Sequence, residues 1–122
     1  NKEGANELEK ILSHLGAKVT ITNTPNGVLH FKSDCSLLDD ETILQTKNMS
    51  LTGFFENQFK VINVPEGEEI VANSLRVNNY LLVPKGFEKT YELLSKSYKI
   101  ILAKVDEISK VDAGLSCMSL RW

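Results

Sequence analysis

The chain lacks the features that mark several large protein classes. It has only two cysteines and three prolines in 122 residues, and no Pro-, Gly- or Ser-rich linker or low-complexity segment interrupts it. No apolar run approaches the roughly 18 residues needed to span a bilayer, and no secretory signal peptide is visible. We therefore expect one domain, residues 1–122, in the cytoplasm and without a membrane partner. Because the chain begins at Asn1, we also expect its start to be internal, processed or truncated.

The chain also lacks a large excess of charge of either sign. The 14 Lys and Arg residues nearly balance the 16 Asp and Glu residues, which leaves a net charge of −2. A chain without a basic surplus has no electrostatic footprint for nucleic acid or anionic membranes, so we expect neither as a partner. The 42% of hydrophobic residues is enough to form a buried core.

The cysteines and histidines do not form a metal-binding pattern. Neither a CxxC nor an HxxxH spacing occurs, so we expect no structural metal and no cofactor. Cys35 and Cys117 can form one disulfide, but free thiols are at least as consistent with a chain that carries no secretion signal.

A repeated pattern runs through the chain. Three short apolar or β-branched runs each open with Lys, at residues 18–22, 60–64 and 99–103, and a stretch of helical character precedes each. The clearest helical stripes, with apolar residues at i, i+3, i+4 and i+7, are Leu8, Ile11, Leu12 and Leu15, and Phe87, Tyr91, Leu94 and Tyr98. The repeat predicts helix–strand–strand modules of an α/β fold.

The predicted elements follow from these runs and from the turn residues between them. Asn78 and Asn79 tolerate a left-handed backbone and suit a tight hairpin. We predict helices at 5–15, 51–57 and 86–97, with a short turn or helix at 105–110. We predict strands at 17–22, 28–35, 41–46, 59–64, 69–76, 79–83, 99–103 and 114–121.

Three polar residues occupy matching places in this repeat. His30, Asn73 and Cys117 each fall in the predicted second strand of a module, 43 and 44 residues apart. In a circular or propeller-like array, matching positions of successive modules converge on one axis. The spacing therefore predicts that these three side chains meet near the centre.

A Cys and a His far apart in sequence but in matching local settings suggest a thiol nucleophile and its acid/base partner. The alternative is that Cys117 and His30 are two ordinary buried residues. Composition and spacing leave both interpretations open.

Longer motifs around these residues resemble a known family. Residues 27–33 (GVLHFKS), 71–73 (VAN) and 111–119 (VDAGLSCMS) look like the C-terminal half of the dimethylarginine dimethylaminohydrolases. These enzymes belong to the guanidino-group-modifying (pentein) superfamily, together with arginine deiminases and amidinotransferases. The resemblance covers essentially the whole chain, and the ending from Gly114 to Trp122 is its most specific part.

The resemblance implies a fold and a set of site residues. The family fold is an α/β propeller, of which this chain would hold about two and a half modules. Cys117 corresponds to the catalytic nucleophile and His30 to the general acid/base. Asp112 matches a carboxylate that contacts the substrate guanidinium, and Ser33 lies near that pocket. Asn73 matches a residue of a central strand, to which we assign no chemical role.

The resemblance also implies binding partners, and it leaves alternative functions open. The substrate would be a small guanidino compound, methylated arginine or arginine. The family's other acidic and arginine residues come from its N-terminal half, whose motifs are absent here, so we expect self-association or binding of such a half. A rival in the same superfamily is an arginine deiminase or amidinotransferase. A rival of another class is a non-catalytic interaction module.

Overall fold

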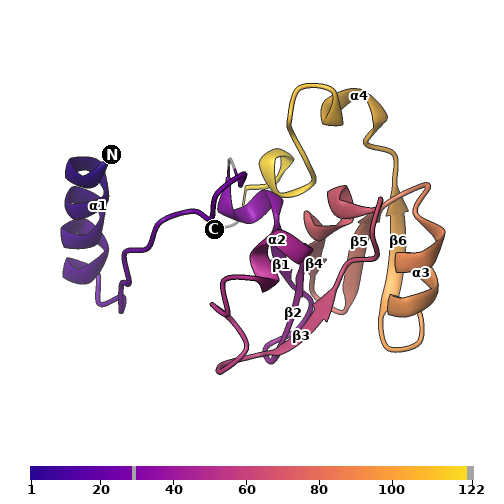
Figure 1. The fold of residues 1–122 in the computed structure, drawn as a ribbon, viewed down its shortest axis with the longest axis horizontal. Coiled ribbons are helices and arrows are strands. Elements are labelled where there is room, and N and C mark those ends of the chain that lie inside the picture. The colour runs from indigo at the N-terminus through magenta and orange to yellow at the C-terminus, as the bar shows by residue number, and fades with distance from the viewer. Residues whose placement is uncertain (29, 121–122) are drawn as a thin grey trace.

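The computed structural model describes residues 1–28 and 30–120. Leu29 of the first motif, Arg121 at the end of the predicted strand 114–121, and Trp122 lie outside the described residues. The elements form two similar units followed by a short C-terminal segment (Figure 1).

Each unit contains a three-stranded sheet with the same topology. In the first sheet, β1 (Cys35–Leu37) pairs antiparallel with β2 (Thr42–Gln45), which pairs parallel with β3 (Lys60–Asn63). The second sheet repeats this order with β4 (Leu75–Val77), β5 (Tyr80–Pro84) and β6 (Lys99–Ala103). The unit is therefore a hairpin, a helix, and a strand parallel to the middle strand.

Helices connect and flank the strands. The chain begins with α1 (Lys2–His14), α2 (Lys47–Ser50) links β2 to β3, and α3 (Glu88–Leu94) links β5 to β6. After β6 comes α4 (Asp106–Ser109). Three 3₁₀ helices lie outside the sheets: η1 (Phe31–Ser33), η2 (Glu69–Ala72) and η3 (Ser116–Met118).

Several predicted elements agree with the structure. The helix near 5–15, the strands near 41–46, 59–64 and 79–83, and the helix near 86–97 are present with shifted ends, and the strand at 99–103 has the predicted bounds. The hairpin is also correct, since Val77 pairs with Tyr80 across Asn78 and Asn79. Asn78 has a φ of 53°, the left-handed conformation that asparagine tolerates.

Other predicted elements are wrong, and among them are the three strands that were predicted to contain His30, Asn73 and Cys117. Residues 17–22 form no strand, and 51–57 form turns after α2. The predicted strands 28–35, 69–76 and 114–121 contain η1, η2 and η3, so His30, Asn73 and Cys117 do not lie in strands. Short apolar runs beside turn residues fit a 3₁₀ turn as well as a strand, and periodicity does not separate the two.

The main core joins the two sheets. The central strand β2 is buried on both faces, so that Ile43 and Leu44 enter different clusters. The cluster around Leu44 contains residues in or directly next to both sheets, residues of η2 and one residue of α3, namely Leu38, Val64, Val71, Ala72, Leu81, Val83 and Leu94. The cluster around Ile43 lies in the first unit and holds Val28, Cys35, Met49 and Phe55. The shared core fixes the two units against each other.

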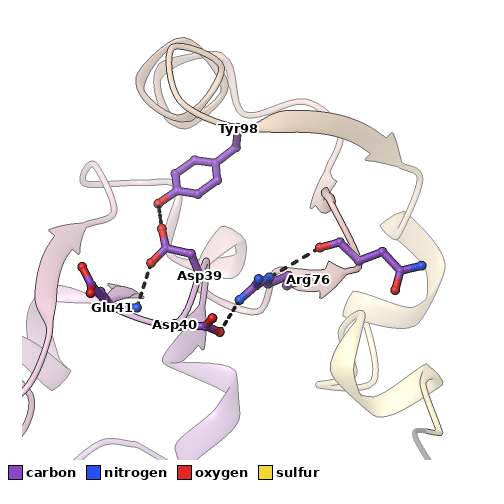
Figure 2. A network of polar contacts seen from close by, with 6 residues as sticks. Asp39, Asp40, Glu41, Arg76 and Tyr98 are labelled. Carbon is purple, nitrogen blue, oxygen red and sulfur yellow. Dashed lines mark hydrogen bonds and ion pairs between the residues drawn. The ribbon is translucent and has the colours of Figure 1, made fainter.

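A polar network also crosses between the units (Figure 2). The Tyr98 hydroxyl donates a hydrogen bond to Asp39, whose carboxylate also accepts from the Glu41 N–H at 2.9 Å. Beside it, Arg76 pairs with Asp40 at 2.7 Å. The network connects the β1–β2 turn to the second sheet and to the start of β6.

The first helix stands away from this body. Figure 1 shows α1 at the end of an extended segment, apart from both sheets, and none of its residues is buried. Among residues 1–28 and 30–120, none of the helices has the length and apolar character that crossing a membrane requires.

Candidate active site

One cavity gathers most of the residues that the sequence singles out. It has a volume of about 270 Å³ and is lined by His30, Ser33, Asn73 and Asp112 together with Gly27, Asp34, Ile70, Ser109, Ala113 and Gly114. These residues lie in or beside η1 and η2, at the end of α4 and in the segment after it. Elements of both units and of the C-terminal segment thus meet at this cavity.

His30 and Ser33 are placed by the η1 turn. His30 has an extended backbone and its carbonyl accepts a hydrogen bond from the Ser33 N–H at 3.0 Å. Next to them, Thr46 donates its hydroxyl to the Asp34 carboxylate at 2.7 Å and its N–H to the Asp34 carbonyl at 2.9 Å. Because Thr46 also caps α2, the turn is tied to the helix of its own unit. His30 itself is exposed and Ser33 is half-buried.

Asp112 is placed by the tight turn that follows α4. Its backbone has a φ of 55°, a left-handed conformation in which an aspartate is tolerated better than most residues. The Asp112 N–H donates to the Ser109 carbonyl at 3.3 Å, and the Ala113 N–H donates to the Ile108 carbonyl at 3.2 Å. The turn leaves the Asp112 carboxylate exposed at the cavity.

Cys117 lies in η3, five residues beyond Asp112, and its side chain is exposed. It does not line the cavity that holds His30 and Asp112. The turn that carries it is nevertheless connected to that cavity, because the Ser116 N–H donates a hydrogen bond to the Asn73 side-chain oxygen at 2.9 Å.

A second and larger cavity, of about 430 Å³, lies between the edge strands β1 and β4. It is lined by Lys32 of η1, by Ser74 shortly after η2 and by Ser116 of η3. The segments around η1 and η2 therefore line both cavities, whereas η3 lines only the larger one. This arrangement places matching segments of the repeat side by side, although they are not strands.

The two cysteines have different environments, and both are free. The disulfide alternative is therefore not realised. Cys35 is buried, and its thiol donates to the Phe31 carbonyl at 3.3 Å. Burial, with a further contribution from Asp34, raises the pKa of the Cys35 thiol to about 11. Cys35 is thus a protonated core residue near neutral pH, whereas the Cys117 side chain is accessible.

Two residues that contact each other in this region have no functional assignment from the local sequence. Asn73 received no role, and Gly114 appeared only as part of a motif. The structure brings Asn73 against Gly114 and Ser116, more than 40 residues away in the sequence. Only a contact map would have shown this, since no local pattern links the positions. Within the described ranges no group of three or more His, Cys, Asp or Glu side chains is placed to hold a metal ion.

Comparison with known proteins identifies relatives over the whole chain. No family model matches the chain. The N(G),N(G)-dimethylarginine dimethylaminohydrolase of Pseudomonas aeruginosa is 32% identical over 123 aligned positions, which cover 100% of this chain and 48% of that protein. The chain therefore spans about half the length of the curated relative that it matches.

Solved structures agree with this match. A P. aeruginosa dimethylarginine dimethylaminohydrolase with a cysteine-to-serine substitution, complexed with citrulline, superposes with a TM-score of 0.92 at 31% identity. A dimethylarginine dimethylaminohydrolase with a histidine-to-glycine substitution, as an adduct with S-methyl-L-thiocitrulline, gives 0.93 at 31% identity. Both matches cover 100% of this chain and 48% of the solved chain.

A more distant structure shares the fold alone. The putative arginine deiminase of Porphyromonas gingivalis gives a TM-score of 0.65 at 15% identity, and the match covers 94% of this chain and 46% of that protein. The resemblance read from residues 27–33, 71–73 and 111–119 is thus confirmed at the level of sequence and of fold.

Proposed function

We propose that the chain is the C-terminal half of a dimethylarginine dimethylaminohydrolase and the portion of that hydrolase that carries the cysteine nucleophile, because it is similar to these enzymes over its whole length. The reaction converts dimethylarginine and water to citrulline and dimethylamine. One observation carries the proposal: His30, Ser33 and Asp112 line a single cavity, and the turn held beside it exposes the thiol of Cys117.

In the first step the Cys117 thiolate attacks the guanidinium carbon of the substrate and forms a C–S bond. A thiolate is a far stronger nucleophile than water near neutral pH, which the resonance-stabilised guanidinium requires. The resulting tetrahedral adduct breaks its C–N bond to dimethylamine. Protonated His30 gives its proton to the departing amine, and an amidino-thioether remains on Cys117.

In the second step water attacks the carbon of the amidino-thioether. Neutral His30 accepts a proton from that water, the C–S bond breaks, and the electron pair returns to the Cys117 sulfur. Citrulline leaves and the thiolate is regenerated. The exposed position of His30 and its place on the cavity wall suit a group that must meet both the amine and the water.

Asp112 and Ser33 have a binding role in this proposal. A carboxylate facing the guanidinium N–H groups fixes the planar cation and keeps its carbon electrophilic. Asp112 offers such a carboxylate, and Ser33 offers a hydroxyl in the lining of the same cavity. The remaining carboxylates and arginines of the family's site come from its N-terminal half.

The architecture follows the same proposal. The two units and the flanking segments would be successive modules of a partial propeller, with η1, η2 and η3 around its axis. Residues 18–22 follow α1 as β6 follows α3, but they form no strand within residues 1–28 and 30–120. We propose that residues 1–122 act as one domain that associates with an N-terminal half of such a hydrolase or with a second copy of the chain.

Selective alkylation tests the proposal without turnover. Cys117 should react with a cationic haloacetamidine faster than with neutral iodoacetamide, because Asp112 attracts the cation, and the Asp112→Asn variant should lose that preference. Cys35 is the internal control, since its buried thiol should react slowly with both reagents. Peptide mapping after labelling separates the two cysteines. An equal preference for the haloacetamidine at Cys117 and at Cys35 would contradict the proposal.

Turnover provides the complementary measurement. We expect negligible citrulline formation from dimethylarginine by the 122-residue chain, and recovery when an N-terminal half is supplied. Recovery that persists in a Cys117→Ser variant would rule out the assigned nucleophile. Rapid turnover by the chain alone would show that the additional carboxylates are dispensable.

A further inference from the structure

We propose that Asn73 is the positioning residue for Cys117: its side-chain amide holds the turn from Gly114 to Met118 in the orientation that presents the thiol. The catalytic meaning of this contact rests on the function proposed above. The contact itself does not, and the experiments below separate the two.

The contact is buried and specific. Asn73 follows η2 and is only 5% exposed. Its Oδ1 accepts a hydrogen bond from the Ser116 N–H at 2.9 Å. That donor opens η3, and the first N–H groups of a helix have no partner within it. Because η3 has no side-chain cap of its own, Asn73 supplies the cap from another unit of the fold.

Gly114 shows how closely the amide approaches this turn. A Cβ atom on Gly114 would overlap the Asn73 side chain, so only glycine fits there. The rest of the turn is closed by its own bonds, since the Cys117 N–H donates to the Gly114 carbonyl at 3.1 Å. The Asn73 amide therefore touches the turn on both sides of Leu115, immediately before the thiol.

The frame behind Asn73 is rigid. Glu68, just before η2, is buried and accepts hydrogen bonds from the Thr90 N–H at 2.8 Å and the Thr90 hydroxyl at 2.6 Å. These bonds fix η2 to the first turn of α3. Val71 and Ala72 are fully buried in the core that both sheets share. Movement of Asn73 would disturb all of these contacts, so the turn is held by the core.

An amide is better suited to this position than a carboxylate. An aspartate oxygen would accept the same hydrogen bond from Ser116. It would also place a negative charge one residue from a sulfur that must become negative to react, and like charges disfavour ionisation. Asparagine gives the same geometry without that charge.

Amide hydrogen exchange tests the contact directly. In Asn73→Ala, the Ser116 N–H should exchange about tenfold faster, the change expected for one lost hydrogen bond, while the N–H groups of β5 and β6 keep their protection. Asn79→Ala, in the exposed turn between β4 and β5, is the matched control and should leave Ser116 unchanged. Unchanged exchange at Ser116 in Asn73→Ala would overturn the proposal.

Asn73→Asp tests the role of charge and covers the case in which the alanine variant does not fold. Its Ser116 N–H should remain protected. Its Cys117 should lose several-fold in the rate of alkylation by anionic iodoacetate relative to neutral iodoacetamide, while Asn79→Asp retains the wild-type ratio. A folded Asn73→Asp chain without Ser116 protection, or with the wild-type ratio, would overturn the proposal.

The proposed function can be refuted independently of the role of Asn73. If wild-type Cys117 shows no preference for the haloacetamidine, the hydrolase assignment loses its support, but exchange at Ser116 still decides whether Asn73 holds the turn. If Cys117 prefers the haloacetamidine, the hydrolase assignment stands. If Asn73→Ala then changes neither that preference nor the exchange of the Ser116 N–H, the role of Asn73 is refuted.

Discussion

Two segments of this chain have the same sequence pattern and different structures. In both, an amphipathic helix leads into a short apolar run that opens with Lys: α1 followed by residues 18–22, and α3 followed by β6. β6 pairs along its whole length with β5, and α3 buries Thr90 and Leu94. Residues 18–22 pair with nothing in the described chain, and α1 buries no residue.

The difference comes from the hairpin that precedes α3. β4 and β5 offer a strand edge for β6 and an apolar face for α3. Within the described residues α1 packs on no such surface, and Leu8, Ile11 and Leu15 are 55%, 54% and 76% exposed. An amphipathic stripe is sufficient to specify a helix, but most of a helix's stability comes from the surface on which it packs.

The largest difference between the two segments should appear in the free energy of unfolding when a core contact of α3 is removed. Leu94→Ala should lower the free energy of unfolding by about 2–5 kcal/mol, because Leu94 is 1% exposed in the core that joins the two sheets. The matched variant Ile11→Ala, on the exposed stripe of α1, should change it by less than about 0.5 kcal/mol. Urea denaturation measures both. Equal losses would show that α1 is packed in solution as α3 is.

A smaller effect is expected at the start of α3, where Glu68 accepts hydrogen bonds from Thr90 and Lys89. Glu68→Ala should cost about 1–3 kcal/mol, because it leaves buried donors without a partner. Glu66→Gln, in the exposed turn nearby, is the control and should be nearly neutral. A neutral Glu68→Ala would mean that the carboxylate does not hold η2 against α3.

The same carboxylate should make stability depend on pH. Burial alone would raise the pKa of Glu68, but the hydrogen bonds from Thr90 and Lys89 outweigh it and lower that pKa below its ordinary value. Ionised Glu68 therefore stabilises the fold above the unfolded-state pKa, and this contribution disappears as the pH falls through the lower folded-state pKa. Urea denaturation between pH 6 and about pH 3 should show a steeper loss for the wild type than for Glu68→Gln.

The smallest effect concerns the surface pair between the units. Arg76→Ala breaks the contact with Asp40, whose side chain is 92% exposed, and should cost at most about 1 kcal/mol, less at high salt. Lys110→Ala, which removes a local surface pair with Glu107, is the matched control. A loss as large as that of Leu94→Ala would mean that charges, rather than the shared core, hold the units together.

The candidate site was predictable only in part. Cys117, His30, Asp112 and Ser33 were identified from motifs, and three of them line one cavity. The assignment of His30, Ser33 and Cys117 to strands was wrong, because each element near the cavity is a short turn held by contacts with distant residues. Thr46 holds η1 through Asp34, and Asn73 holds η3 through Ser116. A local reading of apolar runs has no access to such contacts.

The sequence by itself determined what depends on near neighbours. These features are the repeated helix and Lys-led run, the turn at Asn78 and Asn79, the position of β5, the bounds of β6, and the motifs that indicate the family. The tertiary structure alone decided which of the repeated runs became strands, which cysteine is a core residue, and which amide meets Gly114. The physical reason is that pairing, burial and close approach each need a second surface, and that surface is supplied by residues far away in the chain.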